Sequence, residues 1–413
     1  MLVPKLRFKR EDGSEYPEWE ETTFGETCSG FEYGMNTAAC NYDGVNKYIR
    51  ITDIDDTSRR YMSENAVSPK GNMLDKYIVK PNDILFARTG ASVGKAYLYK
   101  EFDGLLYYAG FLIRANVNTE HNAYFVFAQT LTYDYWNWVK LTSMRTGQQG
   151  INAQEYKEYN FFVPCLEEQQ KIADFLSTVD EVIAQSEAEV QNFEQQKKAA
   201  MQKIFSQEVR FKREDGAEYP EWETDIIGNC VNVTSCKRVH QSDWTDSGVP
   251  FYRAREIVAL YNNEAITPLH ISIEKYKELS EVSGVISSGD LLVTGVGTIG
   301  VPYLVRESDK FYFKDGNIIW FQNTEDRVLG SFLYYTLGTS EFQTKILQDS
   351  GKGTVHTFTI ANAKETTIVV PCLEEQQKIA DFLSAYDEAI SYAKQELEHW
   401  KQLKKGLLQQ MFV

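Results

Sequence analysis

Two glycine-rich segments carry spacings that occur in phosphate-binding sites. TGVGTIG (Thr294–Gly300) contains G-x-G-x-x-G, which in dinucleotide-binding proteins directly precedes a helix. Here Pro302 and strand-forming residues follow, so no helix is expected there. GASVGK (Gly90–Lys95) is one residue shorter than a P-loop, and Ala96 stands where Ser or Thr would bind magnesium. Neither segment therefore predicts a nucleotide or cofactor site.

The remaining reactive side chains do not form a catalytic or metal-binding pattern. The chain has six cysteines and five histidines, with no C-x-x-C pair and no zinc-ligand spacing. We find no glycine-rich or N-P-P-Y-type methyltransferase signature, no P-D…E-x-K nuclease pattern and no G-x-S-x-G. The sequence predicts reduced thiols, no metal site and no catalytic residues.

The clearest feature of the sequence is an internal duplication. PCLEEQQKIADFLS occurs at Pro164–Ser177 and again, letter for letter, at Pro371–Ser384. LRFKREDGSEYPEW (Leu6–Trp19) returns as VRFKREDGAEYPEW (Val209–Trp222). Repeats of this length are too long for solenoid units, so they predict two domain-sized modules in tandem.

Each PCLEEQQ segment opens a long stretch with helical periodicity. Apolar residues recur at alternating spacings of four and three over about five heptads, which predicts a helix of about 35 residues and about 50 Å in each module. Two matched apolar stripes in one chain can bury each other. The expected pairing residues are Ile172, Leu176, Val179, Ile183, Val190, Phe193, Ile204, Ile379, Leu383, Tyr386, Ile390, Leu397, Trp400, Leu407 and Met411. Lys197 and Lys404 occupy the same seam position, where each either extends to water or selects the register.

The segments before these helices predict mixed α/β domains, which we call heads. Short runs rich in aromatic and β-branched residues indicate strands, namely ILFAR, AYLYK, FLIRANV, NFFVP, DLLVTG, FYFKDGNIIWF and TTIVVP. His121–Leu141 and Arg327–Leu347 look helical. KPNDILFARTGASVGK (Lys80–Lys95) corresponds to SSGDLLVTGVGTIG (Ser287–Gly300). The fold class is therefore α/β (α+β) heads in tandem, each followed by a long helix.

The repeated motifs resemble those of the specificity subunit of Type I restriction–modification systems. The signature P-x-L-x-E-Q-x-x-I-x-x-x-L runs from Pro164 to Leu176 and from Pro371 to Leu383. The entry pattern R-F…W-E consists of Arg7, Phe8, Trp19 and Glu20, and again of Arg210, Phe211, Trp222 and Glu223. The N-D-I-L or G-D-L-L run with its glycine-rich loop also fits. The resemblance covers essentially the whole chain.

The resemblance implies a non-catalytic subunit that reads double-stranded DNA. Residues 1–163 and 209–370 would be target recognition domains, each reading one half of a bipartite, asymmetric site. Residues 164–208 and 371–413 would be spacer helices, paired as an antiparallel coiled coil that sets the gap between the half-sites.

The resemblance also implies partner subunits. Each module would dock one modification (methyltransferase) subunit, and restriction (translocase/nuclease) subunits would join the assembly. No cofactor belongs to this chain, because S-adenosylmethionine, ATP and magnesium belong to the partners.

The charge of the chain limits how it can bind DNA. The net charge is -16, and an acidic chain is a poor non-specific binder of phosphates. Residues 26–150 of the first head are neutral, whereas residues 225–360 carry a net charge of -4. We therefore expect partner subunits to supply much of the phosphate affinity and this chain to supply mainly base reading.

Long polar side chains on the glycine-rich loops are the candidates for DNA contact, because Arg pairs well with guanine and Gln with adenine. They are Arg88, Thr89, Ser92, Lys95, Arg145, Gln148 and Gln149 in the first head, and Lys237, Arg238, Thr294, Thr298, Lys352, Thr354 and His356 in the second.

Two other classes of function would each need features of their own. An enzyme acting on DNA by itself would need a cofactor or metal motif. A coiled-coil scaffold for protein binding, without direct DNA reading, would need heads that bind protein. The mean hydropathy of -0.41, with no apolar run of signal-peptide or membrane-spanning length, predicts a cytoplasmic protein.

Overall fold

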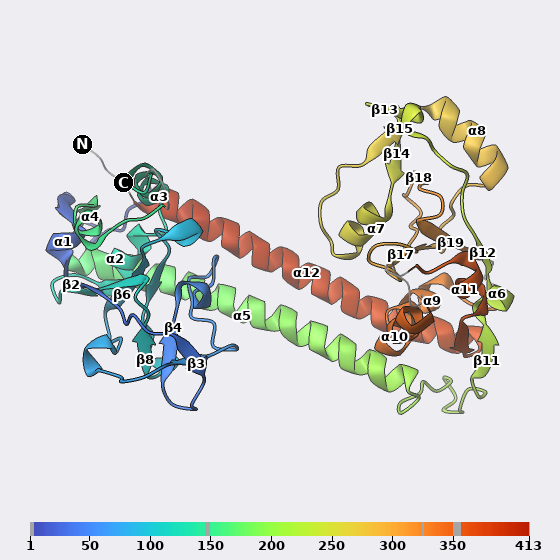
Figure 1. Ribbon diagram of the computed structural model, residues 1–413, viewed down its shortest axis with the longest axis horizontal. Helices are drawn as coiled ribbons and strands as arrows, with labels where there is room; N and C mark the ends of the chain where they lie inside the picture. Colours follow the sequence, from blue (N-terminus) through green and yellow to red (C-terminus); the bar gives the residue numbers. More distant parts are fainter. Residues whose placement is uncertain (1–3, 145–148, 324–325, 350–356, 413) are drawn as a thin grey trace. The chain divides into compact units, whose positions relative to one another are not determined.

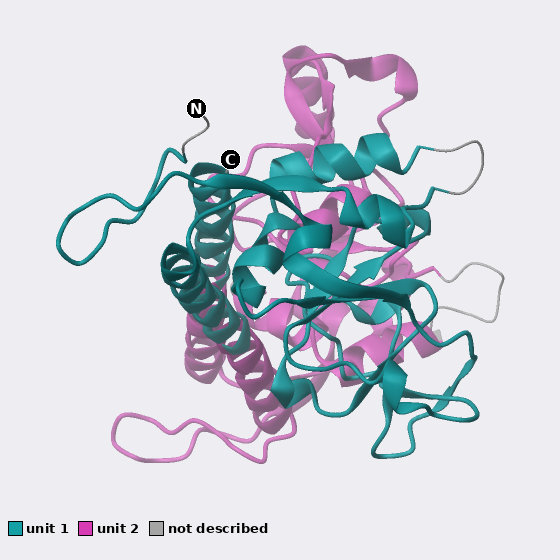
Figure 2. Cartoon of the chain, turned by 90° about the vertical axis from the view of Figure 1, so that its left-hand side faces the viewer, with its two compact units in different colours: residues 1–188, 394–413 teal, residues 189–393 magenta. Residues whose placement is uncertain are grey.

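The structure is a computed structural model that describes residues 4–144, 149–323, 326–349 and 357–412. The chain divides into two compact units, one formed by residues 1–188 and 394–413 and the other by residues 189–393 (Figure 2). Each unit therefore contains one head, the first part of the long helix that follows it, and the last part of the other long helix.

The first head, in which Figure 1 labels β2 and β6, is built on a four-stranded antiparallel sheet of order β2-β9-β6-β7. The strands of this head are β1 (Glu20–Thr23), β2 (Cys28–Tyr33), β3 (Ala39–Asn41), β4 (Lys47–Ile49), β5 (Val67–Pro69), β6 (Asp83–Ala87), β7 (Ala96–Leu98), β8 (Leu106–Tyr108), β9 (Leu112–Val117) and β10 (Asn160–Val163). Its α-helices are α1 (Phe24–Thr27), α2 (Ala123–Gln129), α3 (Tyr133–Thr142) and α4 (Ala153–Lys157). The 3-10 turns are η1 (Ile51–Asp53), η2 (Asp75–Tyr77), η3 (Gly90–Ser92) and η4 (Glu101–Asp103).

The second head repeats this plan with a sheet of order β12-β19-β16-β17. Its strands are β11 (Glu223–Ile226), β12 (Asn232–Thr234), β13 (Trp244–Thr245), β14 (Val249–Tyr252), β15 (Leu269–Ile271), β16 (Leu291–Thr294), β17 (Pro302–Leu304), β18 (Tyr312–Phe313), β19 (Ile318–Gln322) and β20 (Thr367–Val370). Its helices are α6 (Ile227–Cys230), α7 (Ala254–Tyr261), α8 (Ile273–Ser283), α9 (Gly330–Leu337), α10 (Ser340–Asp349) and α11 (Ile360–Glu365), with the 3-10 turn η5 (Gln241–Asp243).

Both faces of each main sheet are covered, which explains the uniformly apolar central strands. In β6, Ile84 and Phe86 join a cluster that contains residues of α2, α3 and α4. Leu85 and Ala87 point to the other face and join a cluster around β4, β7 and β8. Side chains alternate along a strand, so a strand that is buried on both faces reads as a continuous apolar run rather than an alternating one.

The first and last strands of each head pair with each other. Strand β1 pairs antiparallel with β10, and β11 pairs in the same way with β20. The chain therefore enters and leaves each head at one place, directly before the long helices α5 (Leu166–Phe205) and α12 (Leu373–Met411).

The strand predictions are confirmed except for FYFKDGNIIWF, which forms two strands, β18 and β19, because residues 315–317 make a turn between them. The two shorter helical predictions also need one correction. His121–Leu141 forms α2 and α3, and Arg327–Leu347 forms α9 and the first part of α10. In each pair the first helix ends at its own C-cap, Thr130 or Gly338, and a threonine caps the start of the second. Thr132 Oγ1 accepts the amide of Tyr135, and Thr339 Oγ1 accepts the amide of Phe342.

Candidate nucleic-acid interface

The repeated entry motif ties each head to the start of its long helix. Arg7 Nε and Nη2 donate to the two carboxylate oxygens of Glu168 at 2.8 and 2.9 Å, and the Glu168 side chain is fully buried. This contact raises the pKa of Arg7. Arg210 binds Glu375 in the same way at 3.2 and 2.8 Å, and Trp222 Nε1 donates to Glu375 at 3.0 Å. The entry motif and the helix motif therefore meet as a buried ion pair in both modules.

The glutamine of the helix motif has a similar structural role. Gln169 and Gln376 are buried, and each donates its amide at 2.8 Å to the carbonyl of the proline before its helix. Each also accepts the backbone amide of the residue that caps the helix after the main sheet, α2 or α9. The repeated signature thus fixes the head on its helix.

The N-D-I-L and G-D-L-L runs also position the backbone. Asp83 and Asp290 are buried, and each accepts the amide of the residue three positions earlier, Lys80 at 2.7 Å and Ser287 at 2.8 Å. Burial raises the pKa of Asp83. These carboxylates close the turn before β6 and β16, and so fix where the loop at the far end of each strand emerges.

The structure buries or half buries all fifteen expected helix-pairing residues. The lysines at the seam each meet a carboxylate of the opposite helix within their own unit. Lys404 Nζ lies 2.5 Å from Asp180, and Lys197 Nζ lies 2.5 Å from Asp387. Farther along α5, Glu187 meets Lys401, an earlier residue of α12, so the two helices run antiparallel.

The DNA-contact candidates differ in how exposed their side chains are. Seven have side chains that are exposed or half exposed, namely Arg88, Thr89, Ser92, Gln149, Lys237, Arg238 and Thr298. Two, Lys95 and Thr294, are buried. The remaining candidates lie outside the described residues, namely Arg145, Gln148, Lys352, Thr354 and His356.

The buried candidates have partners inside the fold. Lys95 Nζ donates to the Ile54 carbonyl at 2.8 Å and to Asp56 at 2.6 Å. The hydroxyl of Thr294 donates to the carbonyl of Thr298 in the same loop and accepts the amide of Val301 at 3.0 Å. Their burial argues against direct contact with a base, and we leave both out of the proposed interface.

In the first head the structure brings two candidate loops together. The amide of Gly90 donates to the carbonyl of Gln149 at 3.0 Å, and the amide of Ile151 donates to the carbonyl of Arg88 at 2.9 Å. The loop after β6 and the loop before α4 are therefore neighbours, as a shared binding surface requires.

The candidates of the second head do not form one cluster. Arg238 Nε donates to Asp315 at 3.0 Å, and the amide of Lys237 donates to the Tyr312 hydroxyl at the same distance. Thr298 is exposed in the loop after β16. Within the part of the chain that the structure describes, no hydrogen bond or ion pair joins Lys237 or Arg238 to this loop.

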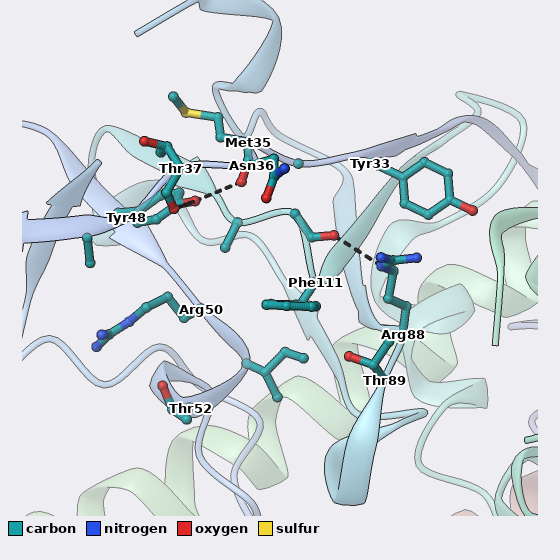
Figure 3. A pocket seen from close by; sticks show the side chains of 15 residues that line it. Tyr33, Met35, Asn36, Thr37, Tyr48, Arg50, Thr52, Arg88, Thr89 and Phe111 are labelled. Atoms are coloured by element: carbon teal, nitrogen blue, oxygen red, sulfur yellow. Dashed lines mark hydrogen bonds between the residues drawn. The ribbon is translucent and has the colours of Figure 1, made fainter. Parts of the chain in front are cut away.

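The first head has an open cleft beside the loop after β6 (Figure 3). Its volume is about 810 Å³. It is lined by Tyr33, Gly34, Met35, Asn36, Thr37, Ala39, Tyr48, Arg50, Ile51, Thr52, Arg88, Thr89, Ala109, Gly110 and Phe111. The lining contains two arginines and no acidic residue, although the whole chain has a net charge of -16. We call this site the head-1 cleft.

Sequence reasoning found Arg88 and Thr89 of the head-1 cleft but missed Arg50 and Phe111. One signal for Arg50 was present in the duplication. Arg50 binds Asp53, three residues later, and Arg253 binds Glu256 with the same side-chain and backbone contacts. A repeated R-x-x-[DE] pattern could have pointed to this turn. Phe111, which is 60% exposed, carried no comparable signal.

The comparisons with known proteins agree with the architecture. A sequence model of the Type I restriction modification DNA specificity domain matches residues 18–192 and again residues 219–401. The chain belongs to this family. It contains two copies of the specificity domain in tandem and is the DNA sequence-recognition subunit, not the catalytic subunit, of a Type I restriction–modification system.

Relatives of this Type I specificity subunit match over nearly their whole length. The chain is 24% identical to the Type I restriction enzyme MjaVIII specificity subunit of Methanocaldococcus jannaschii, covering 97% of this chain and 94% of that protein. It is 26% identical to the putative MjaX specificity subunit of the same organism, with the same coverage.

Solved structures share the fold. The S subunit of the Type I system from M. genitalium has a TM-score of 0.62 at 17% identity, covering 100% of this chain and 99% of that one. A chain from a study of complex assembly and conformational transition of the type I R-M system has a TM-score of 0.56 at 18% identity, covering 96% of each chain.

Among residues 4–144, 149–323, 326–349 and 357–412, no three His, Cys, Asp or Glu side chains are grouped so that they could hold a metal ion. In the same residues no helix combines the length and apolarity needed to cross a bilayer.

Proposed function

We propose that the two heads, residues 1–163 and 209–370, each read one half of a bipartite, asymmetric DNA site. The observation that carries this proposal is the head-1 cleft, whose lining contains no acidic side chain and presents Arg88, which has no ion-pair partner among the described residues. Arginine on a loop beside an open cleft suits the edges of base pairs and the phosphates next to them. The heads differ in sequence, so the half-sites are expected to differ.

The proposed DNA-contacting residues are those with accessible side chains. In the first head they are Arg88, Thr89, Ser92 and Gln149, and in the second head Lys237, Arg238 and Thr298. Arg145, Gln148, Lys352, Thr354 and His356 stay predictions from the sequence.

We further propose that residues 164–208 and 371–413 set the gap between the half-sites. At 1.5 Å per residue, helices α5 and α12, of 40 and 39 residues, are each about 60 Å long. Ion pairs between the two helices support a single register, because sliding by one heptad would separate each lysine from its carboxylate.

Exposed apolar side chains recur in both modules, which supports two copies of one partner. Phe175 and Phe382, in the letter-for-letter repeat, are each 38% exposed, and Leu166 and Leu373, on the opposite side of each helix, are also exposed. Large apolar side chains that stay the same and stay exposed in both modules fit repeated docking contacts. We propose that each module binds a modification subunit, to which restriction subunits add. S-adenosylmethionine, ATP and magnesium would be bound by these partners, and the assembly would work in the cytoplasm.

The test is the methylome of a host that expresses this chain with its neighbouring methyltransferase, compared with a strain in which only this chain is deleted. We expect a split, asymmetric methyladenine motif that disappears on deletion. A methyltransferase that is active on a control substrate yet leaves the same motifs in both strains would contradict the DNA-reading role and favour a protein-binding scaffold.

A further inference from the structure

The two heads hold the loop after the central strand with the same backbone contacts. In the first head the amide of Arg88 donates to the carbonyl of Phe111 at 3.0 Å, and in the second the amide of Gly295 donates to that of Asn317 at 2.8 Å. The carbonyl of Arg88 accepts an amide from the loop before α4 at 2.9 Å, and the carbonyl of Gly295 accepts one from Phe358, before α11, also at 2.9 Å. Arg88 and Gly295 are therefore equivalent backbone positions.

The side chains at these equivalent positions are entirely different. The second head has no side chain at Gly295, and a Cβ atom built there would lie 2.6 Å from the carbonyl oxygen of Phe358. The first head places an arginine at this position and the exposed ring of Phe111 next to it. If the two heads recognise different DNA sequences, the residues that contact bases should differ between them while the backbone stays the same. This position meets both conditions.

The guanidinium group of Arg88 is oriented but not neutralised. Its Nε donates to the carbonyl of Gly110 at 3.1 Å, and its Cζ atom lies 5.0 Å from the centroid of the Tyr33 ring (Figure 3). Within the described residues, Nη1 and Nη2 have no hydrogen-bond partner and Arg88 has no ion pair. The side chain is thus held at one edge, while its two terminal nitrogens can both donate into the head-1 cleft.

Arg50, the other arginine of the cleft, behaves differently. Its Nε and Nη2 donate to both oxygens of Asp53 at 2.8 and 2.7 Å. The same pair recurs as Arg253 and Glu256 in the second head. A residue that is bound to a carboxylate and repeated in both heads cannot distinguish two half-sites. Of the two arginines of the cleft, Arg88 is therefore the one that has no counterpart in the second head.

We propose that Arg88 reads a guanine in the half-site of the first head, donating from Nη1 and Nη2 to the O6 and N7 acceptors of the base in the major groove. Guanine is the base that presents two acceptors at this spacing, and a bidentate arginine is the commonest contact to it. The second head makes no corresponding contact, because Gly295 has no side chain. This inference rests on the proposed function, and it adds which base is read and which residue contacts it.

The experiment uses the full chain assembled with its methyltransferase subunit. The wild-type methylome first supplies the motif. We then measure the methylomes of the variants Arg88→Ala and Arg88→Gln, with Lys140→Ala, an exposed residue of α3 outside the cleft lining, as control. Arg88→Ala should make one guanine position degenerate in one half-site only, and Arg88→Gln should shift that position toward adenine. Lys140→Ala should keep the wild-type motif.

A second measurement tests the contact in the wild-type complex itself. Replacing that guanine by 7-deazaguanine removes the N7 acceptor and should weaken wild-type binding about 2- to 12-fold, as one half of a bidentate contact worth about 5- to 150-fold. In the Arg88→Ala complex the same replacement should have no effect. If Arg88→Ala does not assemble, the same comparison is made with Arg88→Gln, and a wild-type complex that tolerates 7-deazaguanine at every guanine of both half-sites still overturns the proposal.

A split motif that is unchanged in Arg88→Ala would overturn the guanine assignment and leave the DNA-reading role intact. So would a wild-type complex that tolerates 7-deazaguanine at every position. Loss of the chain without loss of the motif would instead contradict the proposed function, and the two failures are therefore distinguishable.

Discussion

The ammonium group of Lys404, near the end of α12, lies 2.5 Å from a carboxylate oxygen of Asp180 in α5. Asp180 also accepts the hydroxyl of Tyr124 in the first head. One carboxylate thus joins both helices and the head of this unit. In the other unit Asp387 is bound by Lys197 at 2.5 Å and by the Tyr335 hydroxyl at 2.7 Å.

The ion pair of Lys404 with Asp180 is expected to stabilise the fold measurably. The two side chains are 17% and 27% exposed, so the pair lies between a surface pair, worth about 0–1 kcal/mol, and a buried pair, whose disruption costs about 3–5 kcal/mol. We expect Lys404→Met and Asp180→Asn each to cost about 1–2 kcal/mol in the free energy of unfolding, measured by urea denaturation.

A double-mutant cycle separates this pair from its surroundings. The double variant should cost less than the sum of the single variants, because the interaction is lost only once. Lys405→Ala, at the exposed neighbouring position, should change stability by less than about 0.5 kcal/mol. Strict additivity would show that the two charges do not interact in solution.

The buried ion pair of the entry motif should be more costly to break. Glu168 is fully buried and Arg7 is 15% exposed, so Glu168→Ala would leave a largely desolvated guanidinium without its partner. We expect a loss of about 3–5 kcal/mol in the free energy of unfolding. Lys9→Ala, which removes an exposed ion pair of the same segment, is the control and should cost far less than Glu168→Ala. Equal losses in the two variants would mean that burial of the pair is unimportant.

The duplication made most of the fold predictable. The repeated helix motif and its heptads predicted α5 and α12, and runs such as ILFAR and FLIRANV predicted β6 and β9, because apolar period and β-propensity are local properties of the sequence. The breaks at Thr132 and Thr339 were missed, since a threonine cap inside an apolar stretch is a weak local signal.

The site was less predictable because exposure depends on contacts far away in the sequence. Arg88 and Lys95 look alike in FARTGASVGK, yet Arg88 borders the cleft while Lys95 reaches a carbonyl 41 positions earlier in the chain. Arg50 comes to the cleft from the turn after a different strand, β4. These contacts join residues that are far apart in the sequence, and no local sequence pattern predicts them.

Burial of the cysteines predicts which thiols can react. Burial raises the pKa of Cys28 and of Cys236 to about 12, so both remain protonated at pH 8 and neither is nucleophilic. Cys40 is exposed. We expect a maleimide at pH 8 to label Cys40 within minutes and to leave Cys28 and Cys236 unlabelled until the chain unfolds. Rapid labelling of Cys28 in the folded protein, located by peptide mass spectrometry, would contradict the packing of β2.

Two glycines should respond to alanine in opposite directions. A Cβ at Gly295 would lie 2.6 Å from a backbone oxygen, so Gly295→Ala must displace the backbone, at a cost of about 1–3 kcal/mol. Gly406 lies inside α12, and a Cβ there meets nothing within 4 Å. Gly406→Ala should therefore stabilise the fold by about 0.5–1 kcal/mol, because alanine loses less backbone entropy in a helix. Thermal unfolding of both variants beside the wild type checks the two signs. A harmless Gly295→Ala would show that the loop after β16 can relax, and would remove the steric reason for the absence of an Arg88 equivalent in the second head.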